Sequence, residues 1–249
     1  MMRQSQESQD LSRRVVLAGI AGAGLLAERT TAAAEPRLTI AVVGDSLADG
    51  MWGGLYRMLQ RDKRVLIVRG AKNSVGFAAS DLTDMLDRAV AQGGKPDAFV
   101  MMIGANDRRS FFIDGRPKAL FKAPRWIELY TERVGRFMDH AGRHKVPVVW
   151  LLLPIMRASD ATADAELIND IIVKAAASRP HVRLMPTRSI TADDRGVYQA
   201  YFKDLKGQVR LMRAGDGVHF TDPAYELMAD RVLALLRAAS PRFQIIGGA

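Results

Sequence analysis

The sequence predicts a single three-layer α/β/α domain, in which a doubly wound, mostly parallel five-stranded sheet is covered by helices on both faces. Two observations predict this fold class. Short, continuous apolar runs alternate with longer amphipathic segments along most of the chain, and no linker or internal repeat interrupts the alternation. Continuous apolar runs are typical of strands buried on both faces of a parallel sheet. Alternating strands and helices place the helices on both faces of one such sheet.

The amino-terminal 34 residues differ from the rest. A polar start ends in Arg13-Arg14, an apolar run follows, and Ala32-Ala33-Ala34 comes before Glu35-Pro36. This order is typical of a secretion signal, and the paired arginines indicate the twin-arginine route. The apolar run is shorter than the ~20 residues that span a bilayer. We therefore expect a cleavable signal over 1–34, a periplasmic or secreted domain over 35–249, and no stable membrane insertion after processing.

The first half of the domain is expected to hold three strands. The run 38–43 is β-branched and apolar, and the helical pattern over 47–60 follows it, although three glycines weaken its opening turns. A second strand is expected over 65–68 and a second helix over 81–90. The third strand, 98–103, ends in the polar turn Gly104-Ala105-Asn106-Asp107.

In the second half, a long polar and aromatic loop covers 108–125 and precedes a helix over 126–140. Prolines bound the fourth strand, 148–153, which fits the confinement of proline to strand ends. A helix over 163–177 and a fifth strand over 182–185 follow, and residues 186–215 are expected to be irregular. The last helix is expected over 222–238, with Asp222 as its N-cap and Pro223 in its first turn.

Composition limits the chemistry. The chain has 249 residues, 48% hydrophobic and 25% charged, a formal charge of +9 and no cysteine. Without cysteine, a disulfide scaffold, a lipid-modified cysteine anchor, a thiol nucleophile and a cysteine-based metal site are all excluded. The positive charge suggests an anionic envelope or substrate, because no nucleic-acid-binding motif accompanies it. No metal or nucleotide motif is present either, so we expect no metal and no cofactor.

Ser46 is the candidate nucleophile. It follows a buried strand and begins a helix, so the free N–H groups of the helix N-terminus lie beside its hydroxyl. Such a serine can attack an acyl carbon. The alternative is that Ser46 or Asp45 simply caps the helix.

Four histidines could serve as the base. His140 and His144 fall at or just beyond a helix end, and His181 precedes a strand. His219 instead follows Asp216 by three residues in a turn before the last helix. That spacing lets Asp216 bind one ring nitrogen while the other accepts the serine proton, although a turn aspartate and a capping histidine would have the same pattern.

An acyl-transfer site also needs donors for the developing oxyanion. The Asn106 side chain and the Ser46 N–H are expected donors, and Gly76 is the expected third, with Gly70 as the alternative. Asn106 and its neighbour could otherwise form an ordinary turn.

These residues fall in four blocks, in order along the chain: Gly44-Asp45-Ser46-Leu47, Gly76, Gly104-x-Asn106-Asp107 and Asp216-x-x-His219. The blocks resemble those of the SGNH (GDSL-type) serine hydrolases, and a subgroup of exported bacterial members in particular. The resemblance implies a three-layer fold, Ser46 as nucleophile, His219 as base, Asp216 as its orienting acid, and an oxyanion hole of Ser46, Gly76 and Asn106. The block around Gly76 matches poorly, which keeps Gly70 open.

Further residues near these blocks are candidates for substrate binding. The loop 108–125 follows the third block and could be a lid, with Phe112 or Trp126 as a stacking platform, or a solvated basic loop pinned by aromatic residues. The candidate substrate-binding residues are Asp45, Asp107, Arg108, Phe112, Trp126 and Arg213.

Together these features predict a periplasmic serine esterase that hydrolyses acetyl or short acyl esters through an acyl-serine intermediate. Its expected partner is an acyl-ester substrate, for example an envelope glycan, and nucleic acid is not expected. Two alternatives remain: an O-acyltransferase that uses the same triad on an envelope polysaccharide, and a glycan-binding protein without turnover. Acyl chain length, alcohol moiety and oligomeric state stay open.

Overall fold

A computed structural model describes residues 37–113 and 116–247 of the chain. The described residues belong to one compact unit, Glu35–Ala249. The expected signal over 1–34 lies outside the described residues. None of the helices in the described ranges is sufficiently long and apolar to cross a membrane.

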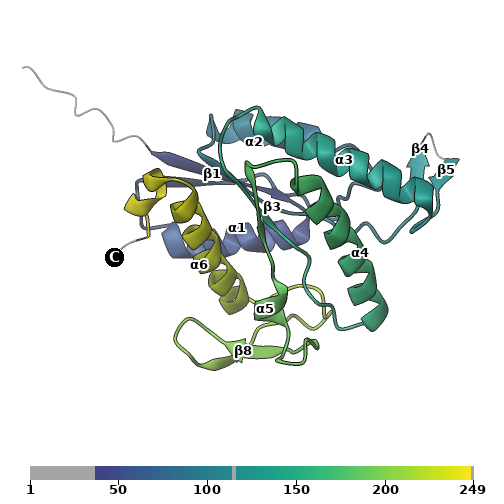
Figure 1. Ribbon diagram of the computed structural model, residues 1–249. Coiled ribbons are helices and arrows are strands. Elements are labelled where there is room, and N and C mark those ends of the chain that lie inside the picture. The colour runs from purple at the N-terminus through teal and green to yellow at the C-terminus, as the bar shows by residue number, and fades with distance from the viewer. Residues whose placement is uncertain (1–36, 114–115, 248–249) are drawn as a thin grey trace, which may run out of the picture. The chain divides into compact units, whose positions relative to one another are not determined.

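A parallel five-stranded sheet forms the centre of the domain (Figure 1), with strand order β2-β1-β3-β6-β7. Its strands are β1 (Leu38–Gly44), β2 (Val65–Arg69), β3 (Ala98–Met102), β6 (Val148–Leu151) and β7 (Val182–Met185). Every neighbouring pair runs parallel. All positions of β1, β3 and β6 are buried, which explains their unbroken apolar sequences. The predicted fold class is therefore confirmed, down to the five strands.

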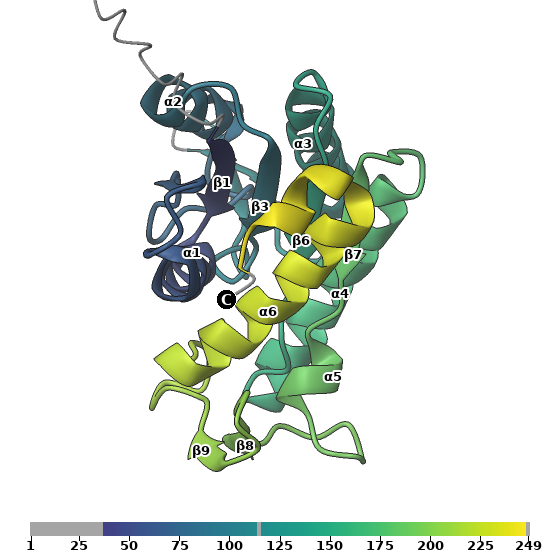
Figure 2. The same ribbon diagram turned by 90° about the vertical axis from the view of Figure 1, so that its left-hand side faces the viewer.

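Helices cover both faces of the sheet (Figures 1 and 2), and five of them are longer than ten residues. Helices α1 (Ser46–Leu59) and α6 (Asp222–Ala239) pack against each other on one face. Helices α2 (Thr83–Gly93), α3 (Pro124–Gly142) and α4 (Ser159–Ala176) pack in series on the other. Each helix was predicted, with ends that differ by a few residues.

Four short elements were not predicted. They are two antiparallel hairpins, β4–β5 (Phe111–Ile113 and Arg116–Ala119) and β8–β9 (Tyr201–Lys203 and Val209–Leu211), the one-turn helix α5 (Arg188–Thr191) and the 3₁₀ turn η1 (Pro241–Ile245). The expectation that 186–215 is irregular is thus wrong in part. Strands of three or four residues are too short to show an alternating pattern, and that is why the sequence did not reveal them.

The N-caps of α1 and α6, the two helices next to the candidate site, are Asp45 and Thr221. Asp45 caps α1, because its Oδ1 accepts a hydrogen bond of 2.9 Å from the Leu47 N–H. At α6 the N-cap position is Thr221 and not Asp222, and Pro223 lies in the first turn as expected. The one-residue shift at α6 corrects the predicted cap without moving the helix.

Glycines in α1 allow it to approach α6 closely. A Cβ atom added at Gly54 would lie 2.5 Å from the backbone oxygen of Tyr225, and one at Gly50 would lie 1.9 Å from the Tyr225 ring. A Cβ at Gly53 would meet only the mobile end of Arg57, at 3.1 Å. The glycines that weaken α1 as an isolated helix are therefore used, at two of the three positions, for contact with α6.

Gly54→Ala is expected to lower the free energy of unfolding by about 2 kcal/mol, because backbone on α6 must move to accept the methyl group. Gly53→Ala is the matched control in the same helix and should be neutral or stabilise by up to about 1 kcal/mol. Urea unfolding of both variants measures the difference. Equal effects at the two positions would contradict this account of the α1–α6 contact.

Candidate active site

The candidate residues gather at the carboxyl edge of the sheet. Ser46 is the first residue of α1 and follows the end of β1, and Gly104 follows the end of β3. The two strand ends are neighbours, since Gly44 pairs with Met102. His219 lies in the loop that leads into α6. Ligands of open parallel sheets bind at this edge, and the structure brings the sequence-predicted residues together there.

Ser46, His219 and Asp216 form a continuous hydrogen-bonded chain. The Ser46 Oγ lies 2.7 Å from Nε2 of His219, and the other ring nitrogen, Nδ1, lies 2.6 Å from Oδ2 of Asp216. The serine and the histidine are 173 positions apart in sequence. This arrangement has the geometry that a serine nucleophile and its base require.

The Asp216 carboxylate fixes the orientation of the imidazole. Its Oδ1 accepts hydrogen bonds from the N–H groups of Val218 and His219, at 2.8 and 2.9 Å. Partial burial alone would raise the pKa of Asp216, but the hydrogen bonds from the His219 side chain and these two N–H groups lower it to about 2. An ionised carboxylate can only accept, so in the neutral ring Nδ1 carries the proton. Nε2 is then the nitrogen that accepts from the serine hydroxyl.

Asp45 is buried beneath the site and holds two strand ends together. Its Oδ1 accepts from the Leu47 N–H, and its Oδ2 accepts from the N–H groups of Gly104 and Ala105, at 3.0 and 3.1 Å. Burial raises the pKa of Asp45 to about 6, against the opposing effect of these three hydrogen bonds. The side chain is 0% exposed. The expectation that Asp45 contacts the substrate is therefore wrong, because its side chain is completely enclosed by other residues of the protein.

Asp107 performs the same task for the loop around Gly76. It accepts hydrogen bonds from the N–H groups of Phe77 and Ala78, at 3.1 and 2.8 Å, and from the Tyr130 hydroxyl at 2.8 Å. Burial raises the pKa of Asp107 to about 6. A Cβ atom at Gly76 would lie 2.2 Å from Oδ1 of Asp107, so this position requires glycine. Asp107 is also fully buried and, against expectation, has no surface for a substrate.

Three candidate oxyanion donors lie along this network. Within the ranges 37–113 and 116–247, no acceptor pairs with the backbone N–H of Ser46 or that of Gly76. The Asn106 amide donates one hydrogen bond to the carbonyl of Val75, at 3.0 Å, which keeps it beside Gly76 and leaves its second proton for a ligand. The N–H of Gly70 is engaged, because it donates to the Val42 carbonyl at 2.8 Å. This difference favours Gly76 over Gly70.

Two further predicted substrate-binding residues are buried. Trp126 is 0% exposed, and its ring nitrogen donates to the Arg109 carbonyl. Its ring stacks on that of Tyr130, with the centroids 4.6 Å apart, so it cannot be a stacking platform for a sugar. Arg213 is only 1% exposed and is enclosed by backbone carbonyls. Burial lowers the pKa of Arg213 to about 10, which leaves the guanidinium charged at neutral pH. Both expectations are thus corrected.

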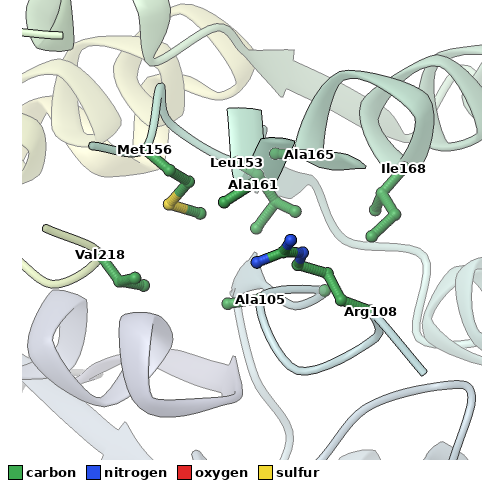
Figure 3. Close-up of a pocket in the computed structure, with 9 residues that line it drawn as sticks. Ala105, Arg108, Leu153, Met156, Ala161, Ala165, Ile168 and Val218 are labelled. Carbon is green, nitrogen blue, oxygen red and sulfur yellow. The ribbon is translucent and has the colours of Figure 1, made fainter. Parts of the chain in front are cut away.

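A small, mainly apolar cavity lies next to the candidate triad. Its volume is about 50 Å³. Figure 3 shows the guanidinium of Arg108 pointing into it. The cavity adjoins the candidate site at two places, since Ala105 precedes Asn106 and Val218 precedes His219. The lining residues are Gly104, Ala105, Arg108, Leu153, Met156, Ala161, Ala165, Ile168 and Val218.

Arg108 is held at this cavity by acidic partners on α4. Its Nε and Nη2 atoms lie 2.7 Å from Asp164 and Asp160, respectively. The buried Asp164 also pairs with Lys122. Of the two predicted substrate-binding arginines, Arg108 lines this cavity and Arg213 does not. Phe112, on β4, is 47% exposed and is absent from the residues that line this cavity.

Sequence reasoning missed the apolar wall of the cavity. Leu153 and Met156 follow β6 at the same carboxyl edge, which was a usable signal, whereas Ile168 lies in the middle of α4 and looks like any core residue. No group of three or more His, Asp or Glu side chains in the described part of the chain is arranged as a metal site. The expectation of chemistry without a cofactor stays a prediction.

Residues 39–235 match the family described as "Protein of unknown function (DUF459)". No curated protein matches the chain.

Solved structures of hydrolases share its fold. A GDSL-like lipase from Bacteroides thetaiotaomicron superposes with a TM-score of 0.57 at 12% identity, over 81% of this chain and 89% of that chain. A member of the lipolytic G-D-S-L family from Veillonella parvula has a TM-score of 0.52 at 16% identity, over 80% and 97%. LAE5, an α/β hydrolase from the metagenome of Lake Arreo, has a TM-score of 0.55 at 18% identity, over 82% and 96%. The fold is therefore that of the GDSL and SGNH hydrolases, as the sequence blocks predicted.

The buried carboxyl of Asp107 predicts a distinctive pH dependence of stability. Its pKa in the folded protein, about 6, lies above the ordinary 3.8, so between these pH values the folded state binds a proton more tightly than the unfolded chain. The stability that this group contributes therefore falls as the pH rises from about 4 to about 6. In Asp107→Asn that loss is absent, and the stability of the wild type relative to the variant should fall by up to about 3 kcal/mol over the interval.

Urea unfolding at several pH values between 4 and 7 measures this difference. Tyr130→Phe removes a hydrogen bond that lowers the pKa of Asp107, so it should move the midpoint of the change to higher pH. A difference between the wild type and Asp107→Asn that does not vary with pH would show that burial does not shift this carboxyl.

Proposed function

From the premise that the chain belongs to the DUF459 family and has the SGNH-hydrolase fold, we propose that it is a serine esterase that cleaves acetyl or other short acyl esters. The observation that carries the proposal is the chain Ser46–His219–Asp216, with contacts of 2.7 and 2.6 Å. A serine hydroxyl, a base and an orienting acid in this order are the parts that acyl transfer needs.

In the proposed first step, the Ser46 oxygen attacks the acyl carbon while its proton passes to Nε2 of His219. The carbonyl oxygen becomes an oxyanion, for which the free N–H groups of Ser46 and Gly76 and the second amide proton of Asn106 are the proposed donors. The ester C–O bond then breaks, and His219 returns the proton to the leaving alcohol. The acyl group is left on Ser46.

In the proposed second step, water attacks the acyl-serine and gives its proton to His219. The bond between the acyl carbon and the Ser46 oxygen breaks, His219 reprotonates that oxygen, and the carboxylic acid leaves. Asp216 stays ionised throughout, consistent with its pKa of about 2, and it stabilises the imidazolium that forms in each step.

The size of the cavity supports a short acyl group. A volume of about 50 Å³ is only about four times what a single water molecule needs. Its walls are mostly apolar, which suits a methyl or ethyl group better than a polar one. The cavity does not constrain the alcohol moiety of the ester. An envelope glycan stays the proposed source of that alcohol.

The proposed site of action is the periplasm or the cell exterior. The support is the Arg13-Arg14 pair, the apolar run and the alanine triplet ending at Ala34, which together are typical of an export signal. The chemistry proposed for Ser46 does not depend on this location.

Ser46→Ala and His219→Ala should each lower kcat for p-nitrophenyl acetate by about 10³-fold or more, because each removes a group that acts in every step. Ser178→Ala and His140→Ala, at positions outside the candidate site, are the matched controls. Steady-state kinetics of the four variants, with circular dichroism to confirm folding, tests the proposal. Undiminished hydrolysis in a folded Ser46→Ala protein would overturn it. A folded wild type without esterase activity would favour a binding protein.

Ile168→Ala should widen the cavity and improve longer substrates. We expect the ratio of kcat/KM for p-nitrophenyl butyrate to that for p-nitrophenyl acetate to rise about tenfold, since added methylene groups gain room against an apolar wall. Ile171→Ala, a buried residue of the same helix that does not line the cavity, is the control and should leave the ratio unchanged. An unchanged ratio in Ile168→Ala would show that the acyl group does not bind in this cavity.

A further inference from the structure

The buried Arg213 side chain is bound to backbone carbonyls on two segments. Its Nη1 donates to the Ile155 carbonyl at 2.7 Å, and its Nη2 donates to the carbonyls of Gly217 and Val218, both at 3.1 Å. Its Nε donates to the carbonyl of His219 itself, at 3.4 Å. Three of these four acceptors thus belong to the loop that carries the candidate base.

The fourth acceptor connects that loop to the sheet. Ile155 lies in the segment between β6 and α4, at the carboxyl edge. The guanidinium is also enclosed by two rings, with its central carbon 4.8 Å from the centroid of Tyr198 and 4.4 Å from that of Phe220. Arg213 therefore joins the loop of His219 to the segment that follows β6, and the rings of Tyr198 and Phe220 pack against its guanidinium.

The charge of Arg213 has no carboxylate partner. Among the described residues, no Asp or Glu forms an ion pair with it. A buried charge without a counter-ion is costly, and an apolar side chain of similar size would cost less. What the guanidinium supplies, and an apolar residue does not, is a rigid plane of donors that reaches several carbonyls at once.

Backbone N–H groups of Arg157 and Ala214 also donate to this loop, to the carbonyls of Gly217 and His219 at 3.1 and 2.9 Å, but the two catalytic candidates on it are open to solvent. The side chains of Asp216 and His219 are 49% and 37% exposed, respectively, so packing alone cannot fix the imidazole. Both groups must nevertheless keep contacts of 2.6 to 2.7 Å with their partners. Small displacements of reacting groups slow the reaction strongly, since a misplacement of about 1 Å can lower the rate about 10²-fold.

We propose that Arg213 is a positioning residue for the base: by binding the carbonyls of Gly217, Val218 and His219, it holds the His219 imidazole in line with Ser46 and Asp216. This inference rests on the proposed esterase function and deepens it. Arg213 does not touch the substrate, so its loss acts on turnover and not on substrate binding.

The test compares Arg213→Met, Arg213→Lys and, as a matched control, Arg179→Met. Arg179, unlike Arg213, binds a carboxylate, that of Asp139, and like Arg213 it donates to a backbone carbonyl, that of Ala175. It comes just before β7, at the amino edge of the sheet, whereas the candidate triad lies at the carboxyl edge. The readouts are kcat and KM for p-nitrophenyl acetate, the thermal midpoint, and the downfield proton NMR signal of the hydrogen bond between Nδ1 of His219 and Asp216. The NMR signal does not depend on turnover.

For Arg213→Met we expect kcat to fall about 10- to 100-fold with KM within about twofold of the wild type, and the downfield signal to broaden or vanish. Arg213→Lys keeps the charge and some donors, so it should recover part of kcat and of the signal. Arg179→Met should change neither, whatever its thermal midpoint.

Wild-type kcat and an intact downfield signal in folded Arg213→Met would overturn the proposal, as would a rise in KM alone. If Arg213→Met does not fold, Arg213→Lys decides by the same two readouts. If neither variant folds, Arg213 is a folding determinant and the proposal fails. A wild type that keeps the downfield signal but hydrolyses no ester would instead contradict the proposed function.

Discussion

The hydrogen bonds of the buried Asp45 carboxylate are the constraint on which the candidate site depends. One oxygen caps α1 and the other binds the N–H groups of Gly104 and Ala105, so a single side chain fixes the end of β1 against the end of β3. Ser46 follows Asp45 directly, and Asn106 follows Ala105. The distance between the candidate nucleophile and the candidate amide donor is therefore set by one rigid, buried group and not by two independent loops.

Asp107 and Arg213 extend this principle to the other two loops. Asp107 holds the loop of Gly76 through the N–H groups of Phe77 and Ala78, and Arg213 holds the loop of His219 through its carbonyls. Acidic side chains thus bind backbone donors, and a basic side chain binds backbone acceptors. Each of the three is an ionisable group buried at a cost, which the pKa of about 6 at both aspartates expresses. All three groups are buried at points where they bind the backbone of loops that form the candidate site.

The fold was predictable because its strands are buried over their whole length. Runs such as 38–43 and 98–103 contain no polar residue inside the sheet except Thr39, and their ends carry the Gly-Asp-Ser and Gly-Ala-Asn-Asp turns. Positions of Ser46, Asn106, Asp216 and His219 at one edge follow from that topology. The hairpins β4–β5 and β8–β9 were missed because strands of three or four residues have no measurable period.

The roles of the remaining polar residues could not be predicted from the sequence, because each depends on a partner distant in the chain. Asp107 finds its partners about 30 positions away, and Arg213 finds Ile155 at a separation of 58. A polar side chain close in sequence to a candidate site residue suggests substrate contact. In the structure, Asp45, Asp107 and Arg213 instead form hydrogen bonds with backbone groups of the site loops. Arg108 lines the cavity next to the candidate triad, where it is held by Asp160 and Asp164 on α4.

The proposed chemistry depends above all on Ser46 being an activated nucleophile. Labelling of the folded protein with a fluorophosphonate probe, followed by mass-spectrometric mapping of the modified peptide, tests it most directly. We expect one stoichiometric adduct, on Ser46, that forms far more slowly in His219→Ala. Absence of labelling in the folded wild type, or an adduct on another residue, would contradict it.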